Sequence, residues 1–139
     1  MKILIVLLVV CFVLLLGSLF SFASAQRSDP VYINGSVLKK VIVKGSNYEI
    51  PYSDLRVILI NTTQRGARYD AKVCNSDFQK TSRDYVRTYS TDSKGSYNFS
   101  CPFKANSAYF LVICTGTNAV QITVPVSTNR YITVPTQRF

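Results

Sequence analysis

The sequence contains no histidine, and this absence removes several catalytic chemistries at once. Serine and cysteine nucleophiles are commonly activated by a neighbouring imidazole, and many zinc sites take imidazole ligands. The chain also lacks a glycine-rich phosphate-binding loop. Acidic residues are few, 7 against 16 Lys and Arg, and most lie in polar segments typical of turns, which disfavours a carboxylate pair of the glycosidase type. We therefore predict a protein that is not an enzyme, with no catalytic residue, no cofactor and no metal site.

The N-terminal segment has the organisation of a secretory signal peptide. An uncharged run follows Lys2, and an Ala-Ser-Ala sequence ends at Ala25. We predict cleavage after Ala25, so that residues 1–25 are the signal peptide and residues 26–139 form one secreted, extracellular domain. The alternative is a retained membrane anchor, because the uncharged segment is long enough to span a bilayer.

The charge balance is strongly basic, with a formal net charge of +9. A basic secreted domain favours anionic partners such as acidic glycans, anionic lipid or nucleic acid. Solubility explains the charge equally well, because the basic residues are scattered and the longest run is Lys39-Lys40. The charge alone therefore selects no partner.

Hydrophobic and polar residues alternate with a period of two along most of residues 26–139, which is typical of β-strands with one buried face. The run from Val57 to Ile60 is apolar throughout and predicts a central strand buried on both faces. Helical spacing is absent from the same region. These patterns predict an all-β, antiparallel β-sandwich of seven to nine strands. Its predicted core comprises Leu55, Val57, Leu59, Tyr97, Phe99, Leu111, Ile113, Ile122 and Val124.

The segment Thr91–Ser100 contains the clearest turn, Thr-Asp-Ser-Lys-Gly, followed by an alternating strand. Asp92 is expected to accept hydrogen bonds from backbone N–H groups of the turn, and Gly95 to supply a positive φ. We predict that this turn has a purely architectural role.

Three Asn-x-Ser/Thr motifs, at Asn34, Asn61 and Asn98, are candidate N-glycosylation sites. Strand parity directs Asn34 and Asn98 away from the core, and Asn61 falls at the end of a strand.

The turn motif Thr91-Asp92-x-x-Gly95-x-Tyr97-x-Phe99 resembles one that recurs in prealbumin-type β-sandwiches, which include transthyretin-like and carboxypeptidase-regulatory-like domains. The resemblance implies a Greek-key sandwich from a secreted branch of this superfamily, and it leaves the individual family open. Its hydrolase and dioxygenase members use histidines that this chain lacks.

Three cysteines, Cys74, Cys101 and Cys114, follow the predicted cleavage site. If the turn after Thr91 joins two paired strands, it brings Cys74 near Cys101, so we predict a Cys74–Cys101 disulfide, with Cys74–Cys114 as the alternative. The odd thiol is then either buried or able to link two chains.

The same hairpin register places Tyr85, Arg87 and Tyr89 together on an outer face, where aromatic rings and a guanidinium offer a candidate binding surface. An ordinary solvated sheet face fits the same pattern.

These observations predict a secreted, non-enzymatic binding protein whose partner is an extracellular protein, an acidic glycan or a small apolar ligand. A structural glycoprotein of the matrix or cell wall and a cationic defence protein are the alternatives. Specific nucleic-acid binding is not expected, and membrane contact is expected only through an uncleaved N-terminal segment.

Overall fold

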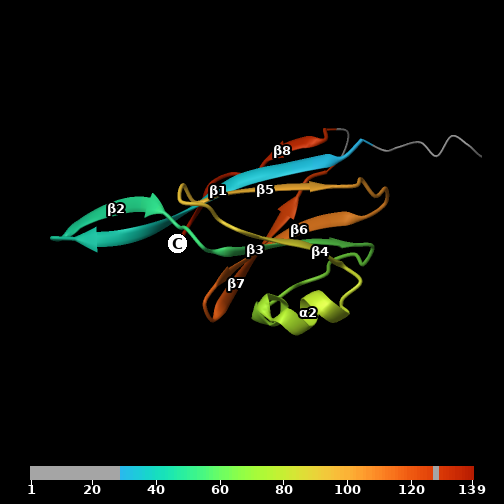
Figure 1. Cartoon of the computed structure of the whole chain (residues 1–139), viewed down its shortest axis with the longest axis horizontal. Helices are drawn as coiled ribbons and strands as arrows, with labels where there is room; N and C mark the ends of the chain where they lie inside the picture. Colours follow the sequence, from blue (N-terminus) through green and yellow to red (C-terminus); the bar gives the residue numbers. More distant parts are fainter. Residues whose placement is uncertain (1–28, 127–128) are drawn as a thin grey trace, which may run out of the picture.

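The computed structural model describes residues 29–126 and 129–139. The predicted signal peptide, its cleavage site and Gln26 lie outside the described residues. Two β-sheets pack face to face (Figure 1), so the predicted all-β sandwich is confirmed. In chain order the elements are β1 (Val31–Val43), β2 (Ser46–Pro51), β3 (Arg56–Thr62), η1 (Ala71–Cys74), α2 (Ser76–Thr81), β4 (Tyr85–Ser90), β5 (Ser96–Cys101), β6 (Ala108–Thr115), β7 (Asn118–Val124), β8 (Tyr131–Thr133) and β9 (Gln137–Arg138).

Strand β1 organises the first sheet because all other strands of that sheet pair with it. One edge of β1 pairs first with β5 and then with β2, both antiparallel. The change of partner occurs at Val37, whose N–H donates to the Gly95 carbonyl at 2.8 Å and whose carbonyl accepts from Tyr52 N–H at 2.9 Å. The opposite edge pairs with β8 and β9, which run parallel to β1 and not antiparallel as predicted.

The second sheet has the order β4-β3-β6-β7 and is antiparallel throughout. Its inner face meets the first sheet across the core. All predicted core residues lie in this core cluster, with Ile122 partly buried at its margin.

Strand β3 is buried on both faces, as predicted. Its outer face, with Ile58 and Ile60, packs in a second apolar cluster with Phe110, Val112 and Val73. Val73 belongs to η1, so the segment containing η1 and α2 covers this side of the sheet (Figure 1).

Two short segments depart from the predicted all-β pattern. The segment ending at Cys74 is the 3-10 turn η1 and not a strand. The polar stretch after it contains the six-residue helix α2, which is too short to show helical periodicity and has no buried residue.

The turn after Thr91 has the predicted local chemistry but connects different strands from those expected. Asp92 Oδ1 accepts from the N–H groups of Lys94 at 2.8 Å and Ser96 at 2.9 Å, and Gly95 has φ 72°. Because β4 pairs with β3 whereas β5 pairs with β1, the turn is a corner between the two sheets and not a hairpin within one. Thr91 fixes this corner, since its buried Oγ1 accepts from Leu55 N–H at 2.9 Å.

Substitutions in this corner provide a first test. Gly95→Val should lower the free energy of unfolding by at least about 2 kcal/mol, because a Cβ there would collide with the Val37 carbonyl oxygen and a β-branched residue is strained at positive φ. Asp92→Ala should cost about 1 kcal/mol through its lost hydrogen bonds. The control Lys94→Ala, at an exposed position, should change stability by less than about 0.5 kcal/mol. Denaturant unfolding curves measure all three, and equal stabilities for Gly95→Val and wild type would contradict this account.

Tyr97 is a polar exception within the core. Its ring lies over Gly35, its cross-strand partner on β1, where any Cβ would collide with the hydroxyl. Among the described residues, the Tyr97 hydroxyl is the buried side-chain oxygen without a hydrogen-bond partner. Burial raises the pKa of Tyr97 to about 12.

Removing this hydroxyl should therefore stabilise the folded protein. Tyr97→Phe should raise the free energy of unfolding by about 1 kcal/mol, since it removes an unsatisfied buried group. The folded protein holds the pKa of Tyr97 above its usual value near 10, so the unfolded chain loses this proton first. Wild type should therefore lose stability as the pH rises from 10 to about 12. The variant has no ionisable group at position 97 and should not lose stability from this cause. Urea unfolding at pH 8 and pH 11 tests both statements. A variant less stable than wild type at pH 8 would mean that the hydroxyl has a favourable role.

Candidate binding surfaces

The β1–β2 hairpin extends beyond the two packed sheets as a projecting arm (Figure 1). We define the arm as residues 38–51, in which Leu38–Val43 of β1 pairs with Ser46–Pro51 of β2. Lys44 and Gly45 form its tip with φ values of 50° and 81°, a pair of positive φ angles typical of a two-residue type I′ turn. This hairpin was not predicted from the sequence.

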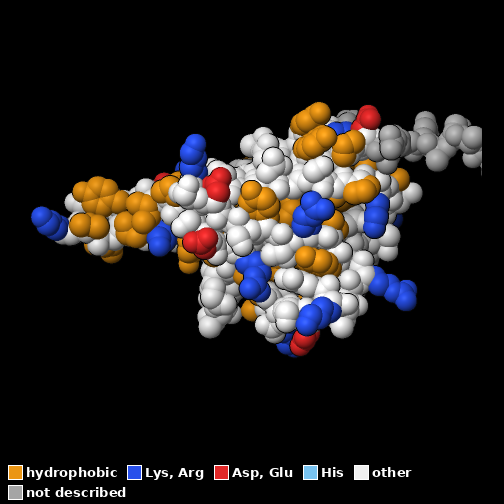
Figure 2. All heavy atoms as spheres, in the orientation of Figure 1, with side chains coloured by type: hydrophobic (Ala, Val, Ile, Leu, Met, Phe, Trp, Pro, Cys, Tyr) orange, Lys and Arg blue, Asp and Glu red, His pale blue; other side chains and the backbone are white. Residues whose placement is uncertain are grey.

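The arm exposes more large hydrophobic side chains than any other part of the described chain. Ile42 is 75% exposed, Tyr48 53%, Val43 51% and Ile50 38%. Figure 2 shows hydrophobic side chains gathered over this end of the molecule. Exposed apolar side chains gathered on one element make the arm a candidate interaction surface.

Strand parity explains why most of these side chains lie on one side. Residues of β1 with the parity of the buried Val37 face the core inside the sandwich. Val41 and Val43 continue this parity beyond the second sheet, and their cross-strand partners are Tyr48 and Ser46. Ile50 pairs with Lys39 on the same side. We call Val41, Val43, Tyr48 and Ile50 the apolar face of the arm.

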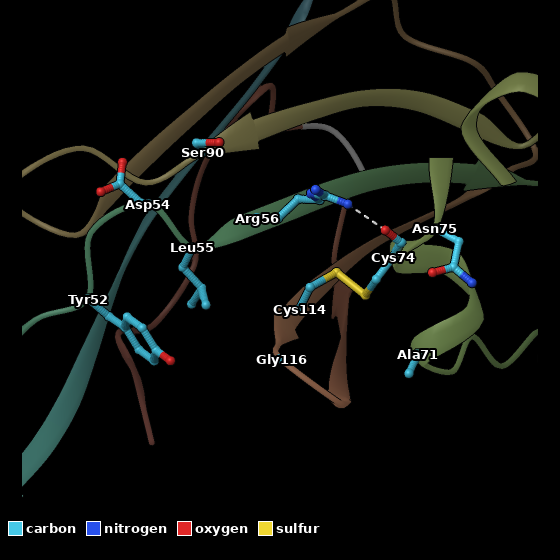
Figure 3. A pocket seen from close by; sticks show the side chains of 10 residues that line it. All are labelled: Tyr52, Asp54, Leu55, Arg56, Ala71, Cys74, Asn75, Ser90, Cys114 and Gly116. Carbon is cyan, nitrogen blue, oxygen red and sulfur yellow. Dashed lines mark hydrogen bonds between the residues drawn. A yellow bond between two sulfur atoms is a disulfide. The ribbon is translucent and has the colours of Figure 1, made fainter. Parts of the chain in front are cut away.

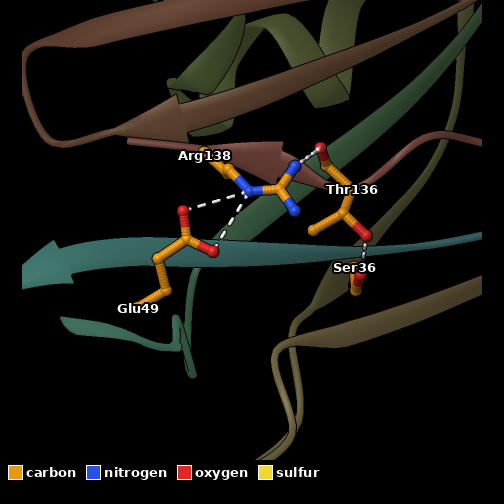
Figure 4. Close-up of polar contacts among 4 residues, drawn as sticks. All are labelled: Ser36, Glu49, Thr136 and Arg138. Carbon is orange, nitrogen blue, oxygen red and sulfur yellow. Dashed lines mark hydrogen bonds and ion pairs between the residues drawn. The ribbon is translucent and has the colours of Figure 1, made fainter.

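A lysine lies at each end of the apolar face. Lys44 lies at the tip, and Lys39 lies at the base with its Nζ 5.1 Å from the centre of the Tyr52 ring. On the opposite face, Lys40 pairs across the strands with Glu49. Glu49 also forms an ion pair with Arg138 at 3.1 Å (Figure 4). With its single acid already paired to Arg138 of β9, the arm keeps a positive charge.

A second candidate surface is a polar groove of about 480 Å³ at one end of the strands of the second sheet, where β3 begins and β4 and β6 end (Figure 3). Arg56 crosses it and donates from Nη1 to the Cys74 carbonyl at 2.5 Å. A guanidinium has five N–H donors, so the groove offers donors to a small anion, although Asp54 also lines it. Tyr52 and Leu55 also line the groove, but its lining is mostly polar, whereas a selective ligand pocket is usually lined mainly by apolar side chains.

The disulfide joins Cys74 to Cys114, with the Cα atoms 6.0 Å apart. The preferred Cys74–Cys101 prediction is wrong, and the alternative pairing is confirmed. The error follows from the corner after Thr91, because β5 and its Cys101 belong to the first sheet while η1 covers the outer face of the second. The bond therefore fastens η1 to β6.

Cys101 is the unpaired cysteine of the described chain, and it is only 4% exposed. Burial raises the pKa of its thiol, which lowers its reactivity. The odd thiol is thus buried, which is one of the two expectations for it, and a disulfide-linked dimer would require Cys101 to become exposed.

The three sequence motifs for glycosylation differ in accessibility. Asn34 and Asn98 are exposed and are direct cross-strand partners on β1 and β5. Asn61 is 7% exposed, and its Nδ2 donates to Ser107 Oγ at 2.7 Å and to the Ala108 carbonyl at 3.2 Å. A glycan on Asn61 would replace one of the two Nδ2 hydrogens and so displace one of these bonds, and modification at all three sites stays a prediction.

The predicted surface of Tyr85, Arg87 and Tyr89 does not exist as one face. The pairing of β3 with β4 shifts between Leu59 and Ile60, so a bulge at Val86 reverses the parity along β4. Tyr85 packs in the outer cluster, whereas Tyr89 packs against the core beside Phe99. Arg87 is exposed between them.

The part of the chain that the structure describes contains neither a group of metal ligands nor a helix suited to crossing a membrane. Within residues 29–126 and 129–139, no group of His, Cys, Asp and Glu could hold a metal ion, and no helix is long and apolar enough to cross a membrane.

The cysteine pairing gives a third prediction. The double variant Cys74→Ala/Cys114→Ala should be less stable than wild type by about 2–4 kcal/mol, because it frees η1 from β6. Cys101→Ala is the control, and it should cost less than about 1.5 kcal/mol because it breaks no covalent bond. Denaturant unfolding compares the variants, and alkylation of the denatured, unreduced protein followed by mass mapping should label Cys101. Labelled Cys114 in wild type would contradict the pairing.

Comparison with known proteins finds a distant likeness in structure alone. No family model matches the chain, and no curated protein matches it. Among solved structures, the chain is similar to the shaft pilin SpaA from Lactobacillus rhamnosus GG, with a TM-score of 0.41 and 14% identity over 78% of this chain and 48% of that chain. A double mutant of that pilin gives a TM-score of 0.41 and 14% identity over 81% and 52%. The chain thus spans about half the length of these pilin structures, and a likeness this weak carries no argument about function. Membership of a transthyretin-like family stays a prediction.

Proposed function

We propose that the chain is a secreted, non-enzymatic binding domain that contacts its extracellular partner through the arm. The observation that carries this proposal is the exposure of Ile42, Val43, Tyr48 and Ile50 on a hairpin that projects from a compact sandwich. Exposed apolar groups of this size cost free energy in water, and large contiguous patches are typical of surfaces that bury them in a partner.

The construction of the arm supports a role in contact. Its base is fixed on both edges of β1, since Tyr52 N–H donates to the Val37 carbonyl and Phe139 N–H donates to the Leu38 carbonyl at 3.1 Å. The ion pair between Glu49 and Arg138 adds a third link to β9. A surface held in place before binding loses less conformational entropy on association.

Secretion is supported by the predicted signal peptide and by the Cys74–Cys114 disulfide, because disulfides persist in oxidising compartments. The missing histidines support a non-enzymatic role.

A structural glycoprotein is the second candidate, favoured by the exposure of Asn34 and Asn98. Glycans there would cover the outer face of the first sheet and leave the arm free, so the two roles are compatible. Burial of Cys101 argues against disulfide-linked assembly in either role.

The test compares variants of the full mature domain for binding to native extracellular material. Val43→Thr/Tyr48→Ser should weaken binding at least about tenfold, because interface energy concentrates in a few apolar and aromatic anchors. Tyr131→Ser is the matched control, since Tyr131 is 72% exposed but lies on β8 of the first sheet. Binding curves with labelled protein give the comparison. Equal binding by wild type and the double variant would exclude the arm as the contact element.

A further inference from the structure

The arm is amphipathic in a way that narrows the chemistry of its partner. Its apolar face comprises Val41, Val43, Tyr48 and Ile50, with Lys39 at the base and Ser46 beside the tip. The opposite face carries Lys40, Asn47 and Glu49 together with Leu38, Ile42 and Pro51. The charged cross-strand pair Lys40 and Glu49 thus lies opposite the apolar face, as in an element at a boundary between water and an apolar medium.

A second copy of the chain is a poor occupant of this face. Each arm carries Lys39, Lys40 and Lys44, and its single acid, Glu49, already binds Arg138. Two arms packed by their apolar faces would bring four ammonium groups, those of Lys39 and Lys44 of each copy, to one interface, on a protein with 16 basic and 7 acidic residues. Like charges at an interface oppose association.

An extended protein strand added to the free edge of β2 is also disfavoured. In a two-residue hairpin the residues that flank the tip, Val43 and Ser46, exchange hydrogen bonds, so alternate residues of β2 point their backbone groups outward. Between Ser46 and the end of the strand these are Asn47 and Glu49, followed by Pro51, which has no N–H. The free edge is therefore too short for an extended ladder and is ended by proline.

We propose that the apolar face of the arm binds the surface of an anionic lipid bilayer. The inference rests on the proposed function, in that it takes the arm as the contact element and assigns its partner. The valines and Ile50 would enter the boundary between headgroups and acyl chains, with the ring of Tyr48 at headgroup level.

The charges of the arm fit this orientation. Lys39 and Lys44 lie at the two ends of the apolar face, where their long side chains reach anionic headgroups while their stems remain in apolar surroundings. The ion pair between Glu49 and Arg138 lies on the other face and stays in water. The unpaired backbone groups at the edges remain at the hydrated interface, so the arm lies on the bilayer and does not span it.

This contact differs from the one that the sequence suggested. Membrane contact was expected only through an uncleaved N-terminal segment. The arm instead combines an apolar face with lysines at its two ends, and it is a β-hairpin within the predicted mature domain.

The absence of tryptophan from the chain makes a direct test available. Tyr48→Trp places the only indole on the apolar face, and Tyr131→Trp places it on an exposed control position of β8. Vesicles of phosphatidylcholine mixed with phosphatidylserine at roughly two to one should shift the Tyr48→Trp emission to shorter wavelength. Pure phosphatidylcholine vesicles should not, and Tyr131→Trp should not shift with either. High salt should reverse the shift, because it screens the lysines.

Sedimentation of wild-type protein with the same vesicles gives an independent measurement. Val43→Asp should lower the vesicle-bound fraction at least about tenfold, and Lys39→Gln/Lys44→Gln should lower it on anionic vesicles alone. No shift of Tyr48→Trp with anionic vesicles would overturn the lipid assignment. If the emission of Tyr48→Trp shifts with rising protein concentration in the absence of vesicles, the arm binds a second copy of the chain, and the lipid assignment is wrong. If variants of the arm weaken binding to extracellular material but not to vesicles, the proposed function holds and the lipid assignment is wrong.

Discussion

Burial of β3 on both faces is the constraint on which the rest of the molecule depends. A strand with Val57 and Leu59 on one side and Ile58 and Ile60 on the other has no face for water. The first sheet covers the inner side, and the segment around η1 covers the outer side. The Cys74–Cys114 bond then attaches the segment around η1 to β6, and this short segment has little regular hydrogen bonding of its own.

The junction at Val37 divides the molecule into a sandwich and an arm. Before it, β1 is covered by the second sheet, and beyond it the same strand continues without a cover. Gly95 lies against the Val37 carbonyl and the Tyr52 amide, so the corner between the sheets is packed at the point where the arm begins. The exposed apolar face is thus the core face of β1 extended past the end of its partner sheet.

Local patterns in the sequence predicted the core well, because alternation fixes which side chains face inward once a strand exists. Tyr97, Phe99 and the residues of β3 are examples. The connections between strands were harder to predict. Asp92 and Gly95 make the same turn whether the flanking strands pair with each other or belong to different sheets. That ambiguity misplaced Cys101 beside Cys74. The bulge at Val86 reversed the parity of Tyr85 against Tyr89, and a bulge leaves no compositional mark. Lys44-Gly45 lacks the Asn-Gly or Asp-Gly signature of a tight hairpin, so the arm was missed.

The parallel pairing of β8 and β9 with β1 has a mechanical consequence. Tension applied at residues 31 and 139 would pull these neighbouring strands along their length in opposite directions. The bonds from Tyr32 N–H to the Arg130 carbonyl, from Val134 N–H to the Asn34 carbonyl and from Lys40 N–H to the Phe139 carbonyl would then share the load in shear, instead of opening one after another. The arm lies outside this load path beyond Lys40. The parallel register of β8 and β9 thus gives the first sheet a shear geometry between these two positions, and the exposed part of the arm lies outside it.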